Sequence, residues 1–134
     1  MRKFIVSIDQ GTTSSRAILF DLKGKPVFVS QLEFTQYFPK DGWVEHNPEE
    51  IWSTTKIVLK KVIQKSKSLK GKILTIGITN QRETTILWDK HTGKAVYNAI
   101  VWQDRRAVEY CNKLIKQKKE TLIYNKTGLL IDAY

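Results

Sequence analysis

This sequence of 134 residues contains little cysteine, histidine or proline: one cysteine (Cys111), two histidines and three prolines. A single cysteine excludes an internal disulfide, which makes a cytoplasmic location the default expectation. Neither His46 nor His91 stands at metal-ligand spacing from another histidine or cysteine, so we expect no zinc site and assign both to loops. Few prolines, together with 41% hydrophobic residues, favour one packed globular domain over a disordered chain.

Membrane-spanning and P-loop signals are also missing. No apolar run approaches the length of a membrane span, and Asp9 cuts short the apolar run that follows Arg2 and Lys3. We therefore expect neither a membrane helix nor a signal peptide. None of the Gly-Lys pairs is followed by Ser or Thr, and none has the upstream glycine of a P-loop, which excludes a Walker-type ATP site.

Basic residues outnumber acidic ones by 23 to 13, which gives a formal net charge of +10. Because a basic balance attracts polyanions, a nucleic-acid-binding module is one alternative. However, 18 of the basic residues are lysines, and they concentrate in residues 56–72 and 113–119 without interleaved aromatic residues. Solvated helix faces explain that pattern more simply, so we expect no specific nucleic-acid partner.

Three short apolar segments open the chain, at residues 4–8, 17–20 and 27–34. The tight turns between them predict an antiparallel three-strand meander. The first turn is the polar octet 9–16, in which glycine allows close approach of a ligand and hydroxyl and N–H groups could cradle phosphate oxygens. Asp9 could hold a hydrated cation, and the guanidinium of Arg16 suits phosphate. On these residues alone, an ordinary polar hairpin turn is an equally good interpretation.

A strong helix start follows at Asn47, with a side-chain cap, Pro48 at the first helical position and acidic residues in the first turn. We predict a helix from Pro48 to about Ser66, closed by Gly71. Residues at helical spacing form its expected apolar stripe: Ile51, Trp52, Thr55, Val58, Leu59, Val62 and Ile63.

The remaining elements are predicted from the same kinds of pattern. Residues 73–79 indicate a buried strand, parallel to a neighbour because a long helix precedes it. A second hairpin is expected from 85–89 and 94–102, and a helix follows, with Ala107, Val108, Cys111, Leu114 and Ile115 on one face. The order is typical of a ribonuclease H-like or actin-like ATPase domain, an α/β fold with a mixed sheet flanked by helices.

The polar cluster 80–83 lies where the predicted parallel strand emerges, the position at which open α/β sheets usually bind ligands. Arg82 can donate hydrogen bonds and Glu83 can accept them, so the two could grip vicinal hydroxyl groups. The alternative is a local salt-bridging turn.

Four segments of the chain resemble the glycerol kinases of the FGGY sugar-kinase family, a group that includes xylulose and gluconate kinases. The segments are DQGTTSSR (9–16), GWVEHNPEEIW (42–52), NQRETT (80–85) and NAIVWQDRR (98–106). The first is shared across the group, whereas WVEH and NQRET are particular to glycerol kinases. The resemblance extends from residue 3 to residue 134.

The resemblance implies that ATP and Mg²⁺ are the cofactors and that the γ-phosphoryl group passes to glycerol, giving sn-glycerol 3-phosphate. It also implies roles for individual residues. Asp9 would hold a magnesium-bound water, and Arg16 would lie beside the nucleotide's phosphates, which contact Thr12, Thr13 and Ser14. Glycerol would be bound by four side chains: Arg82, Glu83, Trp102 and Tyr134.

The same resemblance places the catalytic base, a second phosphate-binding segment and the adenosine pocket beyond Tyr134. We therefore expect residues 1–134 to be the N-terminal part of the first kinase domain, incomplete at the C-terminus and without the second domain. Alone it should be inactive, because phosphoryl transfer needs both sides of the cleft. Three interpretations stay open: a kinase or one piece of a split kinase that a C-terminal piece completes, an inactive remnant, and a basic nucleic-acid-binding module.

Overall fold

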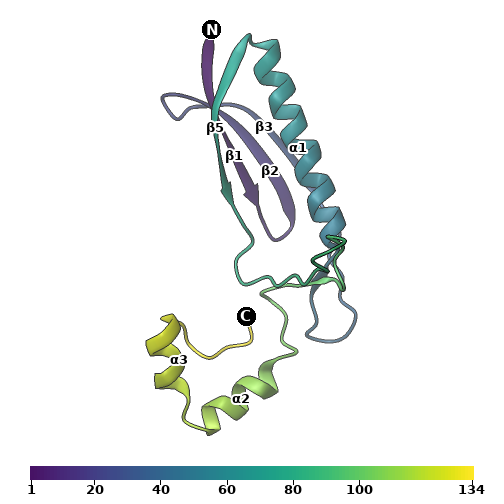
Figure 1. Cartoon of the computed structure of the whole chain (residues 1–134), viewed down its shortest axis with the longest axis vertical. Helices are drawn as coiled ribbons and strands as arrows, with labels where there is room; N and C mark the ends of the chain where they lie inside the picture. Colours follow the sequence, from purple (N-terminus) through teal and green to yellow (C-terminus); the bar gives the residue numbers. More distant parts are fainter.

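The computed structural model describes all residues 1–134, and its main feature is a four-stranded mixed sheet (Figure 1). The strands are β1 (Arg2–Gln10), β2 (Ser14–Asp21), β3 (Pro26–Glu33) and β5 (Gly71–Thr79), in the order β3-β2-β1-β5. β1, β2 and β3 pair antiparallel, and β5 pairs parallel with β1. The predicted meander and the parallel fifth strand are confirmed.

Helix α1 (Pro48–Ser68) makes the crossover between β3 and β5. Its start is as predicted: Pro48 opens the helix, and the side chain of Asn47 accepts a hydrogen bond from the Glu49 backbone N–H at 2.9 Å. The predicted end is wrong in detail. Leu69 caps the helix, Lys70 takes the left-handed turn with φ 51°, and Gly71 already belongs to β5. Gly71 is required there for space, because a Cβ at that position would overlap the Phe4 ring.

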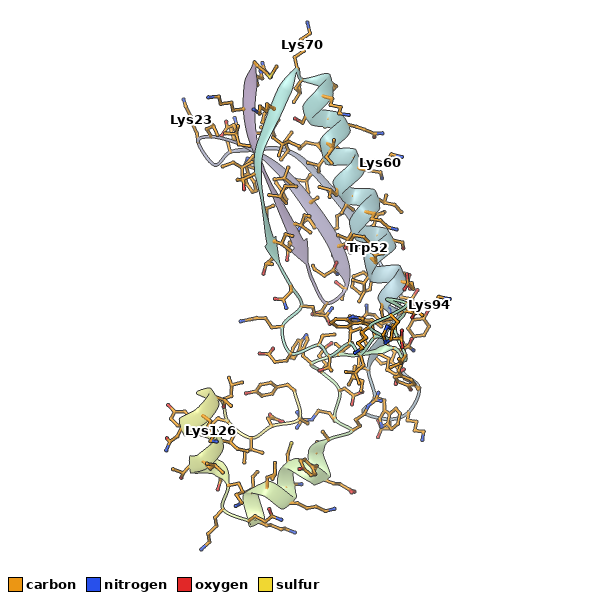
Figure 2. All side chains as sticks on the ribbon, in the orientation of Figure 1. Lys23, Trp52, Lys60, Lys70, Lys94 and Lys126 are labelled. Carbon is orange, nitrogen blue, oxygen red and sulfur yellow. The ribbon has the colours of Figure 1, made fainter.

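α1 covers one face of the sheet and forms the core with it (Figure 1). Alternate residues of β1 and β2 point toward the helix, as the two-residue period of a strand requires. The core residues are Phe4, Val6, Ile8, Ala17, Leu19, Val58 and Val62. The predicted stripe was wrong at Trp52, which is 57% exposed. The buried positions of α1 recur every fourth residue from Thr54, so Trp52, labelled in Figure 2, lies off the buried face of the helix.

β5 differs from its prediction in burial. It is an edge strand, and Leu74, Ile76 and Ile78 are 43–73% exposed. The apolar, β-branched composition of residues 73–79 predicted the strand correctly. It does not determine how much of that strand the other elements cover.

Short elements lie beyond the end of the sheet. β4 (Glu45–His46) pairs antiparallel with β6 (Ala99–Ile100), inside two segments that the sequence interpretation treated as loop and hairpin. The predicted hairpin is reduced to isolated bridges such as Trp88↔Ala95. α2 (Val108–Lys116) forms as predicted, and α3 (Glu120–Thr127) was missed.

Neither α2 nor α3 has a buried residue, and after α3 the chain turns back toward the middle of the molecule (Figure 1). None of the helices is long and apolar enough to cross a membrane.

Candidate functional site

A cleft of about 630 Å³ lies at the carboxyl ends of β1 and β5. Because these neighbouring strands are parallel, the turn after β1 and the polar cluster after β5 emerge at the same edge of the sheet. The lining residues come from four parts of the chain: Asp9, Gln10, Gly11, Thr12, Thr79, Asn80, Gln81, Arg82, Glu83, Trp102 and Tyr134.

Six of the nine site residues expected from the sequence line this cleft: Asp9, Thr12, Arg82, Glu83, Trp102 and Tyr134. Thr13, Ser14 and Arg16 belong to the same turn but do not line it. The Thr13 carbonyl accepts a hydrogen bond from the Phe34 N–H at 3.2 Å, and the Ser14 hydroxyl accepts one from Gln31 at 3.0 Å. These two contacts hold the turn against β3.

Asp9 and Arg16 face each other across the β1–β2 ladder and form an ion pair. Arg16 Nη2 donates to Asp9 Oδ2 at 2.5 Å, and the two side chains are 44% and 32% exposed, respectively. An ion pair this open to water contributes little to stability. The pair uses one carboxylate oxygen of Asp9, so the other can still accept a hydrogen bond from a water.

The turn itself is tight and spans only three residues between the strands. The Gly11 N–H donates to the Ser14 carbonyl at 3.0 Å, and a Cβ on Gly11 would lie 3.2 Å from that oxygen. A side chain at Gly11 would therefore crowd the turn. The indole Nε1 of Trp102 donates to the Thr12 hydroxyl at 3.0 Å, which joins the turn to a residue 90 positions later.

Arg82 and Glu83 are exposed, and neither side chain forms an ion pair or a hydrogen bond within the chain, so the alternative of a local salt-bridging turn is wrong. Glu83 has φ 58°, the left-handed region that non-glycine residues seldom adopt. Such backbone costs about 1–3 kcal/mol and clusters at binding sites. The main chain is held next to it, where Thr85 and Ile100 exchange two hydrogen bonds of 2.9 and 3.0 Å.

The sequence interpretation missed one residue behind the cleft. His46, assigned to a loop, lies in β4, is fully buried, and contacts Gln36 and Gln81. The only local signal was its place in the WVEH segment, since its partners lie 10 and 35 residues away in the sequence.

A buried ion cluster joins β4, next to His46, to the segment after β6. Glu45 and Asp104 are each 1% exposed, and Arg106 bridges them at 2.7 and 2.8 Å. Burial raises the pKa of both carboxyls. Hydrogen bonds outweigh this effect and hold both pKa values below their usual range: Arg106 donates to both, Asn98 and Tyr97 donate to Glu45, and the Val44 N–H donates to Asp104. The Arg106 guanidinium also stacks on Trp43, 3.8 Å from the ring centre. The cluster is structural, because it ties β4 to the segment after β6.

A second hollow, of about 700 Å³, lies between the start of α1 and residues 92–98 (Lys94 in Figure 2). It contains none of the site residues expected from the sequence.

The sheet, the crossover helix and the cleft at the strand ends are those of a nucleotide-handling α/β domain. A family model, "FGGY family of carbohydrate kinases, N-terminal domain", matches residues 4–134, and the chain belongs to this family. The resemblance seen in the four sequence segments is thereby confirmed.

Individual relatives agree with the family. The chain is 58% identical over its whole length to a glycerol kinase of Alkaliphilus metalliredigens and 60% identical to one of Marinomonas sp., and it spans 27% of each. Among solved structures it matches Plasmodium falciparum glycerol kinase with ADP, at TM-score 0.90 and 38% identity, over 99% of this chain and 27% of that one. It also matches gluconate kinase from Lactobacillus acidophilus, at TM-score 0.89 and 26% identity, over 98% of this chain and 26% of that one.

Proposed function

We propose that residues 1–134 form the phosphate- and polyol-binding side of an ATP-dependent glycerol kinase, which transfers the γ-phosphoryl group of ATP to glycerol and gives sn-glycerol 3-phosphate. The observation that carries the proposal is the parallel pairing of β1 with β5, which brings the Asp9–Thr12 turn and the Arg82–Glu83 pair into one cleft. The 55–60% identity to glycerol kinases supports glycerol as the substrate rather than another polyol.

The polyol side of the cleft has the groups that a small triol needs. Arg82 donates to hydroxyl oxygens and Glu83 accepts from hydroxyl hydrogens, and both side chains are free to do so. The indole of Trp102 packs against the carbon skeleton, and the Tyr134 hydroxyl adds a further hydrogen bond. Trp102 and Tyr134 are each 41% exposed, so both present surface to a ligand.

The phosphate side fits a magnesium nucleotide. Mg²⁺ keeps several waters and needs only one or two protein carboxylates, and Asp9 has one carboxylate oxygen left beside Arg16. We assign Asp9 to a magnesium-bound water and Arg16 to the phosphates, with contacts from the hydroxyls and amides of Thr12, Thr13 and Ser14. When bound, the metal neutralises charge on the transferring phosphoryl group.

The cleft offers no free base. Asp9 is assigned to the metal-bound water and Glu83 to glycerol, and these are the two carboxylates that line the cleft, so neither remains to take the proton from the attacking hydroxyl. We propose that this base, like the adenosine pocket, comes from protein beyond the 134 residues. A cytoplasmic location and the lack of a specific nucleic-acid partner stay predictions.

We predict that the 134-residue chain alone does not phosphorylate glycerol, because ATP would meet one wall of the cleft and no base. A coupled assay for ADP measures this directly. The matched comparison is a chimera in which residues 1–134 replace the matching region of the Brevibacillus brevis glycerol kinase. The two are 58% identical over 132 residues. Glycerol-dependent turnover by the chain alone would refute the prediction, and an inactive chimera would favour an inactive remnant.

In the same chimera, Arg82→Ala is expected to lower kcat/KM for glycerol by about 10–100-fold. The reason is that a glycerol hydroxyl would lose its hydrogen-bond partner, which costs about 1–3 kcal/mol of binding free energy. The KM for ATP should change little, since Arg82 is assigned to the polyol. Steady-state kinetics with each substrate varied would separate the two effects. Arg2→Ala, at the start of β1, is the control and should match the parent; equal glycerol kinetics in Arg82→Ala would disprove the assignment.

A further inference from the structure

His46 is fully buried and both of its ring nitrogens are engaged. Nε2 lies 2.5 Å from the carboxamide oxygen of Gln36, and Nδ1 lies 3.4 Å from the carboxamide nitrogen of Gln81. A carboxamide oxygen only accepts and a carboxamide nitrogen only donates, so the imidazole is neutral, with its proton on Nε2. Burial lowers the pKa of His46, against the attraction of Glu50, and this agrees with the neutral form.

The two glutamines that contact His46 both donate to the turn after β1, and Gln81 itself belongs to the segment after β5. Gln36 Nε2 donates to the Thr12 carbonyl at 3.2 Å, and Gln81 Nε2 donates to the Gly11 carbonyl at 3.0 Å. Gln81 also accepts a hydrogen bond from the Thr84 hydroxyl. That hydroxyl in turn accepts one from the backbone N–H of Trp102 at 3.3 Å.

The contacts therefore run from one imidazole to the turn after β1 and to the segment that carries Arg82 and Glu83.

We propose that His46 is a positioning residue of the cleft. Without touching a ligand, it fixes the Gly11–Thr12 turn relative to residues 81–84 through Gln36 and Gln81. A neutral imidazole suits this place because it presents one donor and one acceptor at opposite sides of a rigid ring. Lysine and arginine offer no acceptor, and phenylalanine offers neither group. What the two positioned sides bind rests on the proposed function; the positioning itself does not.

The tautomer is tested first, in the chain with His91→Phe, which leaves His46 as the single histidine. His91 is exposed on a turn, so its substitution serves as the control. A long-range ¹H–¹⁵N spectrum should show a proton on Nε2 and a bare Nδ1. A proton on Nδ1 alone, or on both nitrogens at neutral pH, would overturn the proposal.

The positioning is tested by amide spectra of His46→Phe, with His91→Phe as the control. We expect the resonances of Gly11, Thr12 and the Trp102 indole N–H to move, while those of the turn at Lys23 and Lys25, at the other end of the sheet, stay in place. Unmoved cleft resonances in a folded His46→Phe would contradict positioning. If that variant does not fold, His46→Gln, which keeps one donor and one acceptor, takes its place and should move them less.

Binding is tested by calorimetric titration of the chain with glycerol. His46→Phe should bind about tenfold more weakly than the parent, the effect of one misplaced hydrogen bond, and His46→Gln should recover part of the loss. Equal affinity in His46→Phe would overturn the inference. If the parent binds no glycerol, the titration is repeated with the chimera; should the chimera bind none either, the proposed function fails, while the tautomer and the cleft resonances still decide the role of His46.

Discussion

Arg106→Ala is expected to lower the free energy of unfolding by about 3–5 kcal/mol, the cost of breaking a buried ion pair by removing one partner. Arg106 donates to Glu45 at 2.7 Å and to Asp104 at 2.8 Å, and these carboxylates are almost completely shielded from water. Neither has another cation within reach. The variant would also lose the stacking of the guanidinium on Trp43.

The neighbouring residue provides the matched control. Arg105 forms an ion pair of the same length, 2.8 Å, with Asp132, but the two side chains are 51% and 40% exposed. Water screens such a pair, so Arg105→Ala should cost at most about 1 kcal/mol. Urea unfolding followed by circular dichroism would measure both. A loss in Arg106→Ala no greater than that in Arg105→Ala would show that the cluster does not stabilise the fold.

The same cluster makes the free energy of unfolding depend on pH. The folded-state pKa values of Glu45 and Asp104 are lowered, so the unfolded chain binds protons at a higher pH than the folded chain. Their contribution is fully present above the unfolded pKa values and is lost as the pH falls through the folded ones. The parent should therefore lose stability in acid more steeply than Arg106→Ala, in which this contribution is already missing.

The elements that sequence patterns predicted are those set by neighbouring residues. The cap at Asn47, the meander of residues 4–34 and the start of β5 depend on local turn chemistry and on periods of two or 3.6 residues. The cleft could also be anticipated, because parallel strands place their carboxyl ends at one edge whatever the side chains are.

What the patterns missed depends on contacts between distant segments. β4 and β6 are two residues each, too short to show a period, and they pair across more than fifty positions. His46 has a role only because Gln36 and Gln81 reach it. Trp52 was assigned to the core because it is apolar, but the four-residue spacing of the residues that face the sheet turns it outward. Composition could not decide these points, since they are properties of the assembled structure.

Asp9→Asn, made in the chimera, is expected to lower kcat by about 100–1,000-fold, the usual effect of removing one group that stabilises transition-state charge. The asparagine keeps the shape of the side chain and can still accept from Arg16, but it loses the charge that would orient a magnesium-bound water. Because the Asp9–Arg16 pair is partly exposed, stability should change by less than about 1 kcal/mol. A large loss of activity in a folded protein would therefore report on chemistry rather than on folding.

The control is the same substitution at Asp21, at the opposite end of the sheet. The Asp21 side chain accepts hydrogen bonds from the Lys23 and Lys25 amides at 2.9 Å, so an asparagine there also keeps its contacts. Initial rates would be measured across a range of Mg²⁺ concentrations at saturating glycerol and ATP. Asp9→Asn should need more Mg²⁺ and still turn over slowly, whereas Asp21→Asn should match the parent. If Asp9→Asn keeps the parent's kcat and Mg²⁺ dependence, Asp9 does not hold the metal-bound water, and the phosphate side of the cleft needs another assignment.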